Sequence, residues 1–221
     1  MEELFQIEKI LGFCEKVCYF FVINLLFAAS NIPVLLFLLF AGAGQIRECL
    51  PLFLLCLVLM APALSAVMYA MNRLIHGTEG RAFRDYKKGY CSGFMQKAGI
   101  GAGQLLLILM FWTNIEFFSI QVPILPLAAV FVALFAAAVL VTPNLYMLAS
   151  RYEMSSLQTA KTAAVLLIAK PVLTLGNLAA LGLVLAAYEI AAGTAVLFMG
   201  SVYGFLVMFM NQSVMRELEN R

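Results

Sequence analysis

Apolar stretches long enough to cross a lipid bilayer make up most of this sequence, and only short charged clusters separate them. Of its 221 residues, 64% are hydrophobic and 12% are charged, and the mean hydropathy is +0.97. A water-soluble domain is nearer half apolar and a quarter charged. This chain therefore has too little polar surface to cover a soluble globule of its size. The composition indicates an integral membrane protein.

The pattern predicts an all-α, polytopic membrane protein that forms a single domain over residues 1–221 and crosses the bilayer six times. A spanning helix needs about 20 apolar residues to cross roughly 30 Å of hydrocarbon. The expected spans lie at about 17–41, 49–71, 98–115, 122–148, 172–188 and 194–210. The last two must be separate, because the 39-residue run from Val172 to Met210 would be about 59 Å long as one helix. Glu189 and the helix-breaking Gly193 indicate the turn between them.

Two shorter amphipathic helices are expected on the cytoplasmic side of the membrane. Residues 1–16 place apolar side chains on one stripe with charges opposite, which is typical of a helix at the interface. Their acidic start and the long apolar run that follows predict an anchor and not a cleaved signal peptide. The second helix is predicted over residues 155–170, with Ser155 as its N-cap and Pro171 as its end.

The distribution of positive charge predicts that both termini face the cytoplasm. In the six-span arrangement, one side of the membrane holds 13 of the 14 lysines and arginines, and the other holds only Arg47. Cytoplasmic loops carry the excess of such residues, so the side with 13 is assigned to the cytoplasm. Each of the three outer turns then carries one acidic residue, namely Glu48, Glu116 or Glu189.

The densest charge cluster, from Arg73 to Lys97, forms the main cytoplasmic loop. Four aromatic residues recur in it every three or four positions, so a helix would put them on one stripe. The candidate contact face consists of Phe83, Arg84, Tyr86, Lys87, Lys88, Tyr90 and Phe94. Its basic residues would attract anionic lipid, at about 1 kcal/mol each. The stripe could rest on the bilayer, which is the favoured expectation, or dock a cytoplasmic partner.

Neutral polar residues are the only polar ones predicted at mid-depth in the spans. No acidic or basic residue lies there. This argues against a proton-coupled carrier, because an ionisable group at that depth costs at least about 2.5 kcal/mol and usually marks function. The candidate intramembrane cluster consists of Asn24, Asn31, Pro33, Asn144 and Asn177. Two roles remain open, hydrogen bonding between helices, which is the favoured one, and the lining of a solute path.

Two glycine pairs with a spacing of four predict close contacts between helices. Gly99 and Gly103 share one face of the third predicted span, and Gly200 and Gly204 share one face of the sixth. These faces could serve packing within the chain or a homo-oligomer.

The sequence carries no catalytic, cofactor-binding or metal-binding motif. His76 is the one histidine, which excludes HExxH sites because they need two, and the sequence has no GxSxG motif of the kind that carries the serine of many histidine-based triads. The five cysteines show no metal-ligand spacing, and the net charge of +2 argues against nucleic acid as a partner. A non-enzymatic protein without a cofactor is therefore expected.

Motifs in the first half of the chain are typical of one known family. Asn24-Leu25-Leu26 followed by Asn31-Ile32-Pro33 resembles its Asn-x-Leu-Trp motif with a later proline. Phe27 stands near the usual tryptophan, and Val34-Leu35-Leu36 replaces the Thr-Ile-Gly that often follows the proline.

Two further segments carry the same resemblance. Ala61-Pro62-Ala63, then Ala66 and Met68-Tyr69, is similar to a Gly-Pro-Ala…Ala-Leu-Tyr segment. Glu79, followed by residues 83–88, is similar to an acidic and aromatic-basic loop. On these residues the chain resembles the YesL-like family, membrane proteins of unknown function common in Gram-positive bacteria.

The resemblance implies a multi-pass protein of the bacterial cell membrane. Because family members are often encoded beside carbohydrate uptake systems, it also implies an accessory link to sugar transport or its regulation, and it supplies no catalytic residues. One hypothesis is a non-enzymatic accessory protein whose cytoplasmic face engages another component, such as part of a sugar transporter. The alternative is a small carrier or channel for a neutral solute, with the asparagines along its path.

Overall fold

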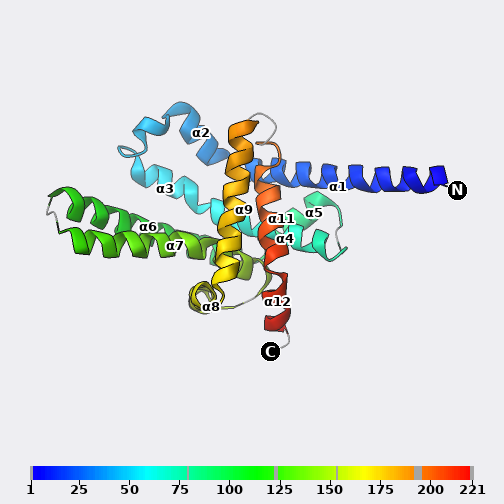
Figure 1. Ribbon diagram of the computed structural model, residues 1–221. Helices are drawn as coiled ribbons and strands as arrows, with labels where there is room; N and C mark the ends of the chain where they lie inside the picture. Colours follow the sequence, from blue (N-terminus) through cyan, green and yellow to red (C-terminus); the bar gives the residue numbers. More distant parts are fainter. Residues whose placement is uncertain (1, 79, 122–123, 153, 192–195, 220–221) are drawn as a thin grey trace.

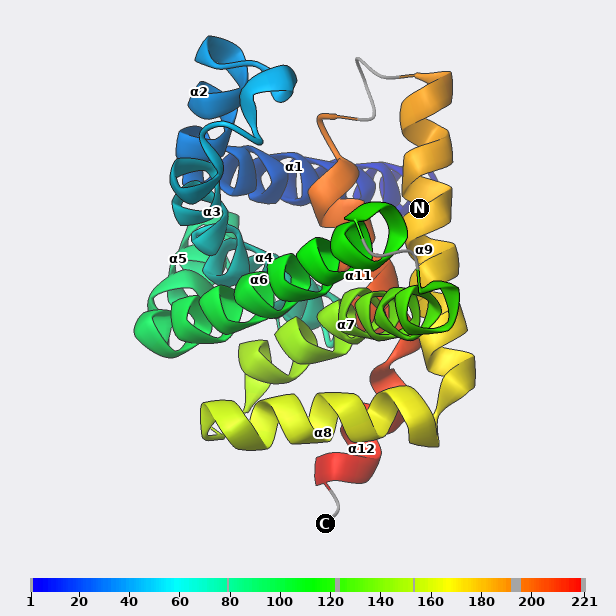
Figure 2. The same cartoon turned by 90° about the vertical axis from the view of Figure 1, so that its left-hand side faces the viewer.

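A computed structural model of the chain describes residues 2–78, 80–121, 124–152, 154–191 and 196–219, and the regular elements in them are all helices (Figures 1 and 2). The predicted all-α class is confirmed. The elements are α1 (Glu2–Ser30), α2 (Ile32–Phe40), η1 (Ala43–Gln45), α3 (Leu50–Val58), α4 (Met60–Ile75), α5 (Ala82–Cys91), α6 (Phe94–Glu116), η2 (Phe117–Gln121), α7 (Leu125–Arg151), α8 (Ser156–Ala169), α9 (Pro171–Ile190), α11 (Met199–Met210) and α12 (Gln212–Glu219). Five described stretches are long and apolar enough to cross a membrane: Leu11–Ser30, Leu50–Ile75, Phe94–Gln121, Leu125–Arg151 and Pro171–Ile190.

The first helix differs from the prediction. α1 continues without a break through the expected boundary between a surface helix at 1–16 and a span that begins at residue 17. The bend expected near Pro33 is confirmed, because α1 ends at Ser30 and α2 begins at Ile32. Proline has no amide hydrogen to donate to the preceding turn. Beside this break, Asn31 Nδ2 donates a hydrogen bond to the carbonyl oxygen of Phe27 at 2.8 Å.

The second predicted span, 49–71, also consists of two helices. α3 ends at Val58 and α4 begins at Met60. Pro62 explains the interruption, because it cannot donate a hydrogen bond to the carbonyl oxygen of Val58 four residues earlier. Together the two helices still make a continuous apolar stretch of 26 residues.

The helix predicted at residues 155–170 is confirmed by α8. The side-chain oxygen of Ser155 accepts a hydrogen bond from the backbone N–H of Gln158 at 3.4 Å, as an N-cap should. Lys170 separates α8 from α9, which begins at Pro171. The position of α8 on a membrane surface stays a prediction.

The long apolar run near the C-terminus folds back, as expected, into the antiparallel pair α9 and α11 (Figure 2). Gly193, where the turn was predicted, lies outside the described residues. α11 has 12 residues and is about 18 Å long, which is short for a hydrocarbon core of roughly 30 Å. In both views α9 and α11 run across the hairpin of α6 and α7, not alongside it. The sixth crossing, predicted at 194–210, is therefore not confirmed.

α4 is the helix around which the others pack. It contacts α1, α5, α6, α7 and α11. The buried residues of this helix are Ala61, Pro62, Ala63, Ser65, Ala66, Val67, Met68, Ala70 and Met71. Most of them are small, so neighbouring backbones can come close on several sides at once.

Glycines on the neighbouring helices complete this close packing. A Cβ added to Gly204 of α11 would lie 2.6 Å from Val67 Cγ1, and one added to Gly89 of α5 would lie 2.9 Å from Tyr69 Cβ. Carbon atoms do not approach so closely, so a side chain at either position would push its helix away from α4. Gly200, also in α11, is equally close to α1. The predicted face of Gly200 and Gly204 is thus confirmed as an internal packing face.

The other predicted glycine face, Gly99 and Gly103, does not pack within the chain, and its use in a homo-oligomer stays a prediction. A Cβ added to Gly99 or Gly103 would meet nothing within 4 Å. Gly101, which lies between them on a different face of α6, makes the contact instead, because a Cβ there would overlap the Cβ of Ala61. Helix α6 therefore approaches α4 through the middle glycine of the three.

Replacing Gly101 with Ala should destabilise the protein by about 1–3 kcal/mol, the usual cost of forcing an extra methyl group into a packed core. Gly103→Ala on the same helix is the matched control. It has free space, and alanine favours helix by up to about 1 kcal/mol over glycine, so its stability should stay equal or rise. Thermal unfolding of both variants in detergent micelles measures the difference. Equal stabilities would contradict the packing of α6 against α4.

Candidate functional site

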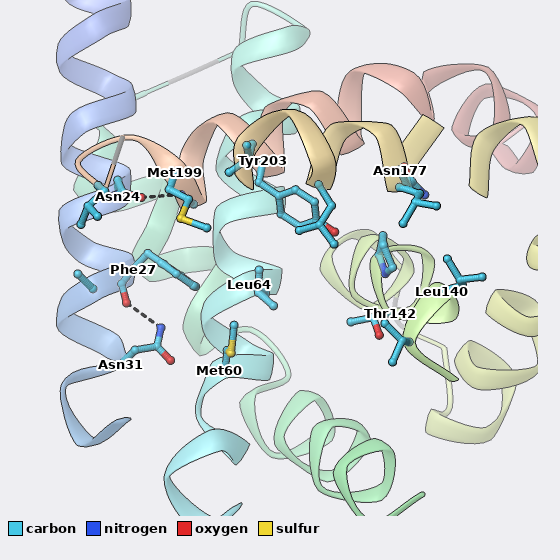
Figure 3. A pocket seen from close by; sticks show the side chains of 18 of the residues that line it. Asn24, Phe27, Asn31, Met60, Leu64, Leu140, Thr142, Asn177, Met199 and Tyr203 are labelled. Atoms are coloured by element: carbon cyan, nitrogen blue, oxygen red, sulfur yellow. Dashed lines mark hydrogen bonds between the residues drawn. The ribbon is translucent and has the colours of Figure 1, made fainter. Parts of the chain in front are cut away.

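A cavity of about 460 Å³ lies between α1, α4, α7, α9 and α11 (Figure 3). Its lining is mostly aliphatic and aromatic, and none of the described lining residues carries a charge. The polar residues in the lining are Asn24, Asn31, Thr142, Thr174, Asn177 and Tyr203. Cavities of this size and character are usual for small-molecule sites, in which a few polar groups orient a largely apolar ligand.

Asn24 joins α1 to the start of α11. Its Nδ2 donates to the carbonyl oxygen of Val196 at 2.8 Å, and its Oδ1 accepts from the backbone N–H of Gly200, also at 2.8 Å. Both ends of the amide are therefore used in holding two helices together. A side chain at Gly200 would displace this contact, because its Cβ would lie 2.9 Å from Asn24 Oδ1. Asn24 serves the structure of the cavity wall.

Two lining residues have buried polar atoms without a partner. Asn31 uses its amide nitrogen on Phe27, while its Oδ1 is buried and accepts no hydrogen bond. Figure 3 shows this oxygen turned away from α1 toward the side of Met60. Thr174 of α9 is 8% exposed, and its Oγ1 is also buried without a partner. Buried polar atoms are nearly always paired, so these two are exceptions whose hydrogen-bonding capacity is not used within the chain.

Three asparagines form a chain of hydrogen bonds behind the cavity. Asn177 Nδ2 donates to Asn144 Oδ1 at 3.0 Å, and Asn211 Nδ2 donates to Asn177 Oδ1 at 2.8 Å. The Asn211 amide also donates to the carbonyl oxygen of Val207 at 2.8 Å. The chain connects α7, α9 and the end of α11. These bonds hold the helices that form one side of the cavity.

The structure thus brings most of the predicted polar cluster together. Asn24, Asn31 and Asn177 line the same cavity, and Asn144 bonds to Asn177. Pro33 lies two residues beyond Asn31, in α2, and does not line it. Whether this cluster binds or conducts a solute stays a prediction.

The sequence did not predict two residues that line the cavity, Thr174 and Tyr203, or Asn211, which bonds to the lining residue Asn177. Thr174 and Tyr203 gave no signal, because isolated residues of these types are common in apolar helices. Tyr203 projects its ring into the middle of the cavity (Figure 3). Asn211 follows the last apolar residue of its run, so the sequence gives no sign that it is buried. In the structure Asn211 is 1% exposed and directs its amide inward.

The charged loop has a buried anchor, Asp85, at its centre. Asp85 is completely buried, forms an ion pair with Arg73, and accepts a hydrogen bond from the backbone N–H of Gly80 at 2.8 Å. Tyr19 of α1 donates to the same carboxylate at 3.1 Å. Arg73 also donates to the carbonyl oxygen of Thr78. One carboxylate therefore connects α1, α4, α5 and the segment that precedes α5.

The predicted aromatic stripe does not form one exposed face. Tyr86 is 4% exposed and donates to Ser30 Oγ of α1 at 2.9 Å, and burial raises the pKa of its hydroxyl. Tyr90 stacks on Tyr86, and Phe94 packs against Tyr90, with ring centroids 6.1 and 5.4 Å apart. Phe83 alone is largely exposed, at 62%. Tyr86 faces the core because the same side of α5 carries Asp85 and Gly89, which bind it to α1 and α4.

The basic residues of the loop do lie on the surface. Arg84, Lys87 and Lys88 are exposed, and their spacing puts them on one side of α5 together with Phe83. These four residues are termed the α5 basic face below. Whether this face contacts lipid or a protein stays a prediction.

Residues 20–115 match the family described as "Protein of unknown function, DUF624". The match covers less than half of the chain, and this segment is similar to the DUF624 family. YesL-like proteins belong to the same family, so the resemblance predicted from the motifs is confirmed. No curated protein and no solved structure matches the chain.

The DUF624 region includes the buried Asp85, the α5 basic face, and Asn24 and Asn31 of the cavity. The other side of the cavity, with Thr174 and Asn177, lies beyond it. The DUF624 region therefore contributes α1 and α4 to the cavity, and α7, α9 and α11 enclose the rest.

Replacing Asp85 with Asn should destabilise the protein by about 2–3 kcal/mol. Breaking a buried ion pair usually costs more, about 3–5 kcal/mol, but Arg73 is 30% exposed and water will compensate part of the loss. Tyr19→Phe removes one hydrogen bond to the same carboxylate and should cost about 1 kcal/mol. Unfolding in detergent, followed by circular dichroism, compares the two variants. An Asp85→Asn effect no larger than that of Tyr19→Phe would contradict the anchoring role of Asp85.

Proposed function

We propose that this protein is an integral membrane accessory protein, without a catalytic role, that presents the α5 basic face to a membrane-bound partner. The observation that supports the proposal is the fixed position of α5. Asp85, Tyr86 and Gly89 hold one side of α5 against α1 and α4, and the opposite side carries Phe83 and three cations in water. A rigid cationic face with an exposed aromatic ring suits an acidic protein surface.

The proposal includes a multi-pass arrangement in a bacterial cell membrane, with both termini on the side of the basic loop. Contacts near the ends of α4 and α7 support this arrangement. Arg151 at the end of α7 donates to Asn72 Oδ1 of α4 at 3.0 Å, and Tyr152 donates to the carbonyl oxygen of Met215 in α12 at 3.4 Å. The C-terminal helix thus packs beside the end of α4 from which the basic loop begins. Helix α6 begins just after the basic loop and ends at Glu116, which pairs with Arg47. Both residues are predicted to lie in outer turns.

The partner that we propose is a component of a sugar uptake system. This identification rests on the family resemblance and not on a contact in the structure. The proposal contains no chemical step. The single histidine, His76, follows α4 and bonds to the carbonyl oxygen of Asn72 at 2.8 Å.

A second candidate function is a carrier or channel for a neutral solute. The uncharged cavity beside Asn24, Asn31 and Asn177 supports this alternative. Uptake of labelled sugars into proteoliposomes separates the two candidates. Flux that exceeds that of empty liposomes would favour the carrier, and its absence with correctly folded protein would favour the accessory role.

Partner contact can be tested by replacing Phe83 with the photoreactive p-benzoylphenylalanine and irradiating native membranes. We expect a discrete cross-linked protein. Combining this replacement with Arg84→Glu, Lys87→Glu and Lys88→Glu should reduce the product at least about fivefold, because like charges then face the partner. The control carries the same charge change at three exposed sites elsewhere, Lys16→Glu, Lys161→Glu and Arg216→Glu. Cross-links to lipid alone, or equal losses in both sets, would contradict the proposal.

The orientation can be tested through Cys91, which is exposed on α5. In a variant that keeps only this cysteine, a membrane-impermeant maleimide should label permeabilised cells and not intact ones. A matched variant with no native cysteine and Glu48→Cys, an exposed position in a predicted outer turn, should be labelled in intact cells. Labelling of Cys91 in intact cells would place the basic loop outside and refute the arrangement.

A further inference from the structure

We propose that the cavity between α1, α4, α7, α9 and α11 binds an uncharged lipid with one free hydroxyl group, of the diacylglycerol class. This inference goes beyond the accessory role, and it does not depend on the α5 basic face. It assigns a ligand class to a site that is otherwise a set of packing residues.

The residues that line the cavity indicate that its ligand is uncharged and mostly hydrocarbon. None of the described lining residues is acidic or basic, so an ionised ligand would enter without a counter-ion, which is strongly unfavourable in an apolar site. A sugar would bring many hydroxyl groups, and the described lining offers few free partners for them. The site therefore suits a molecule that is mostly hydrocarbon.

The two buried unpartnered atoms indicate the polar group of the ligand, and the Tyr203 hydroxyl lines the same cavity. Asn31 Oδ1 can only accept a hydrogen bond, and its amide nitrogen is already used on Phe27. Thr174 Oγ1 can donate and accept, and it is buried without a partner. A ligand hydroxyl group can donate to either oxygen and accept from Thr174. The free hydroxyl of a diacylglycerol supplies this group on an apolar body.

The rim of the cavity indicates where the ligand comes from. Three of its lining residues, Leu35, Leu178 and Val196, are also about half exposed on the protein surface, at 52%, 49% and 52%. The cavity therefore reaches an apolar outer surface. Its walls include α7, α9 and parts of α1 and α4 that are apolar enough to lie in a bilayer. An apolar opening in such a surface admits a molecule from the hydrocarbon phase more readily than one from water.

Photolabelling tests the proposal with the full-length protein in nanodiscs. A diacylglycerol that carries a diazirine in one acyl chain should label the cavity helices, and excess dioleoylglycerol should compete. Dioleoylglycerol whose free hydroxyl is acetylated, phosphatidic acid with the same chains, and maltose should each compete at least about tenfold less well. Equal competition by the acetylated lipid or by phosphatidic acid would overturn the proposal, and competition by maltose would favour a sugar site.

Two variants locate the site. Thr174→Val keeps the shape of the side chain and removes only an unpaired hydroxyl, so the fold should be at least as stable while labelling falls about five- to tenfold. Ala28→Phe fills the cavity and should abolish labelling. The matched control is Ser65→Ala, which also removes a buried unpartnered hydroxyl, but at a position that does not line the cavity. Labelling unchanged in Thr174→Val and Ala28→Phe, or reduced equally in Ser65→Ala, would refute the site.

Discussion

The close approach of three helices to α4 is the constraint on which the rest of this structure depends. Small residues cover α4, and Gly89, Gly101 and Gly204 bring α5, α6 and α11 against it. Lipid hydrocarbon is as apolar as the side chains, so helices in a bilayer associate through close packing and hydrogen bonds more than through the hydrophobic effect. Once these contacts are made, α11 positions α9 beside it, and the cavity forms between this pair, α1 and α7.

The same packing gives the charged loop a structural role beyond membrane orientation. A buried carboxylate is costly unless it is paired and hydrogen-bonded, and Asp85 has Arg73, the backbone of Gly80 and Tyr19 as partners. This arrangement separates the two sides of α5 by function. The side with Asp85 and Tyr86 holds the loop to the neighbouring helices, and the basic side is exposed on the protein surface, where an accessory role would need it.

Local sequence signals predicted some elements well, and long-range packing decided the rest. Ser155 and Pro171 delimit α8 through interactions within a few residues, so this helix could be predicted. The sequence could not show which glycine of α6 packs against α4. Gly99, Gly101 and Gly103 occur at every second position, and only the position of α4 in the fold determines that Gly101 makes the contact. The burial of Tyr86 likewise depends on α1, which is distant in sequence. The sequence also predicts that the asparagines form a cluster. It does not show that Asn24 bonds between two helices while Asn31 keeps an unpaired acceptor, because these roles depend on how the helices pack.

The central claim is that α5 is part of the packed protein and not a solvated loop. Hydrogen exchange of the intact protein in nanodiscs tests this claim most directly, since backbone amides exchange only when their segment opens. If α5 is anchored through Asp85 and Gly89, the amides of residues 85–91 will exchange at least about a hundredfold more slowly than those of an unstructured peptide. Exchange at the unstructured rate across these residues would contradict the account.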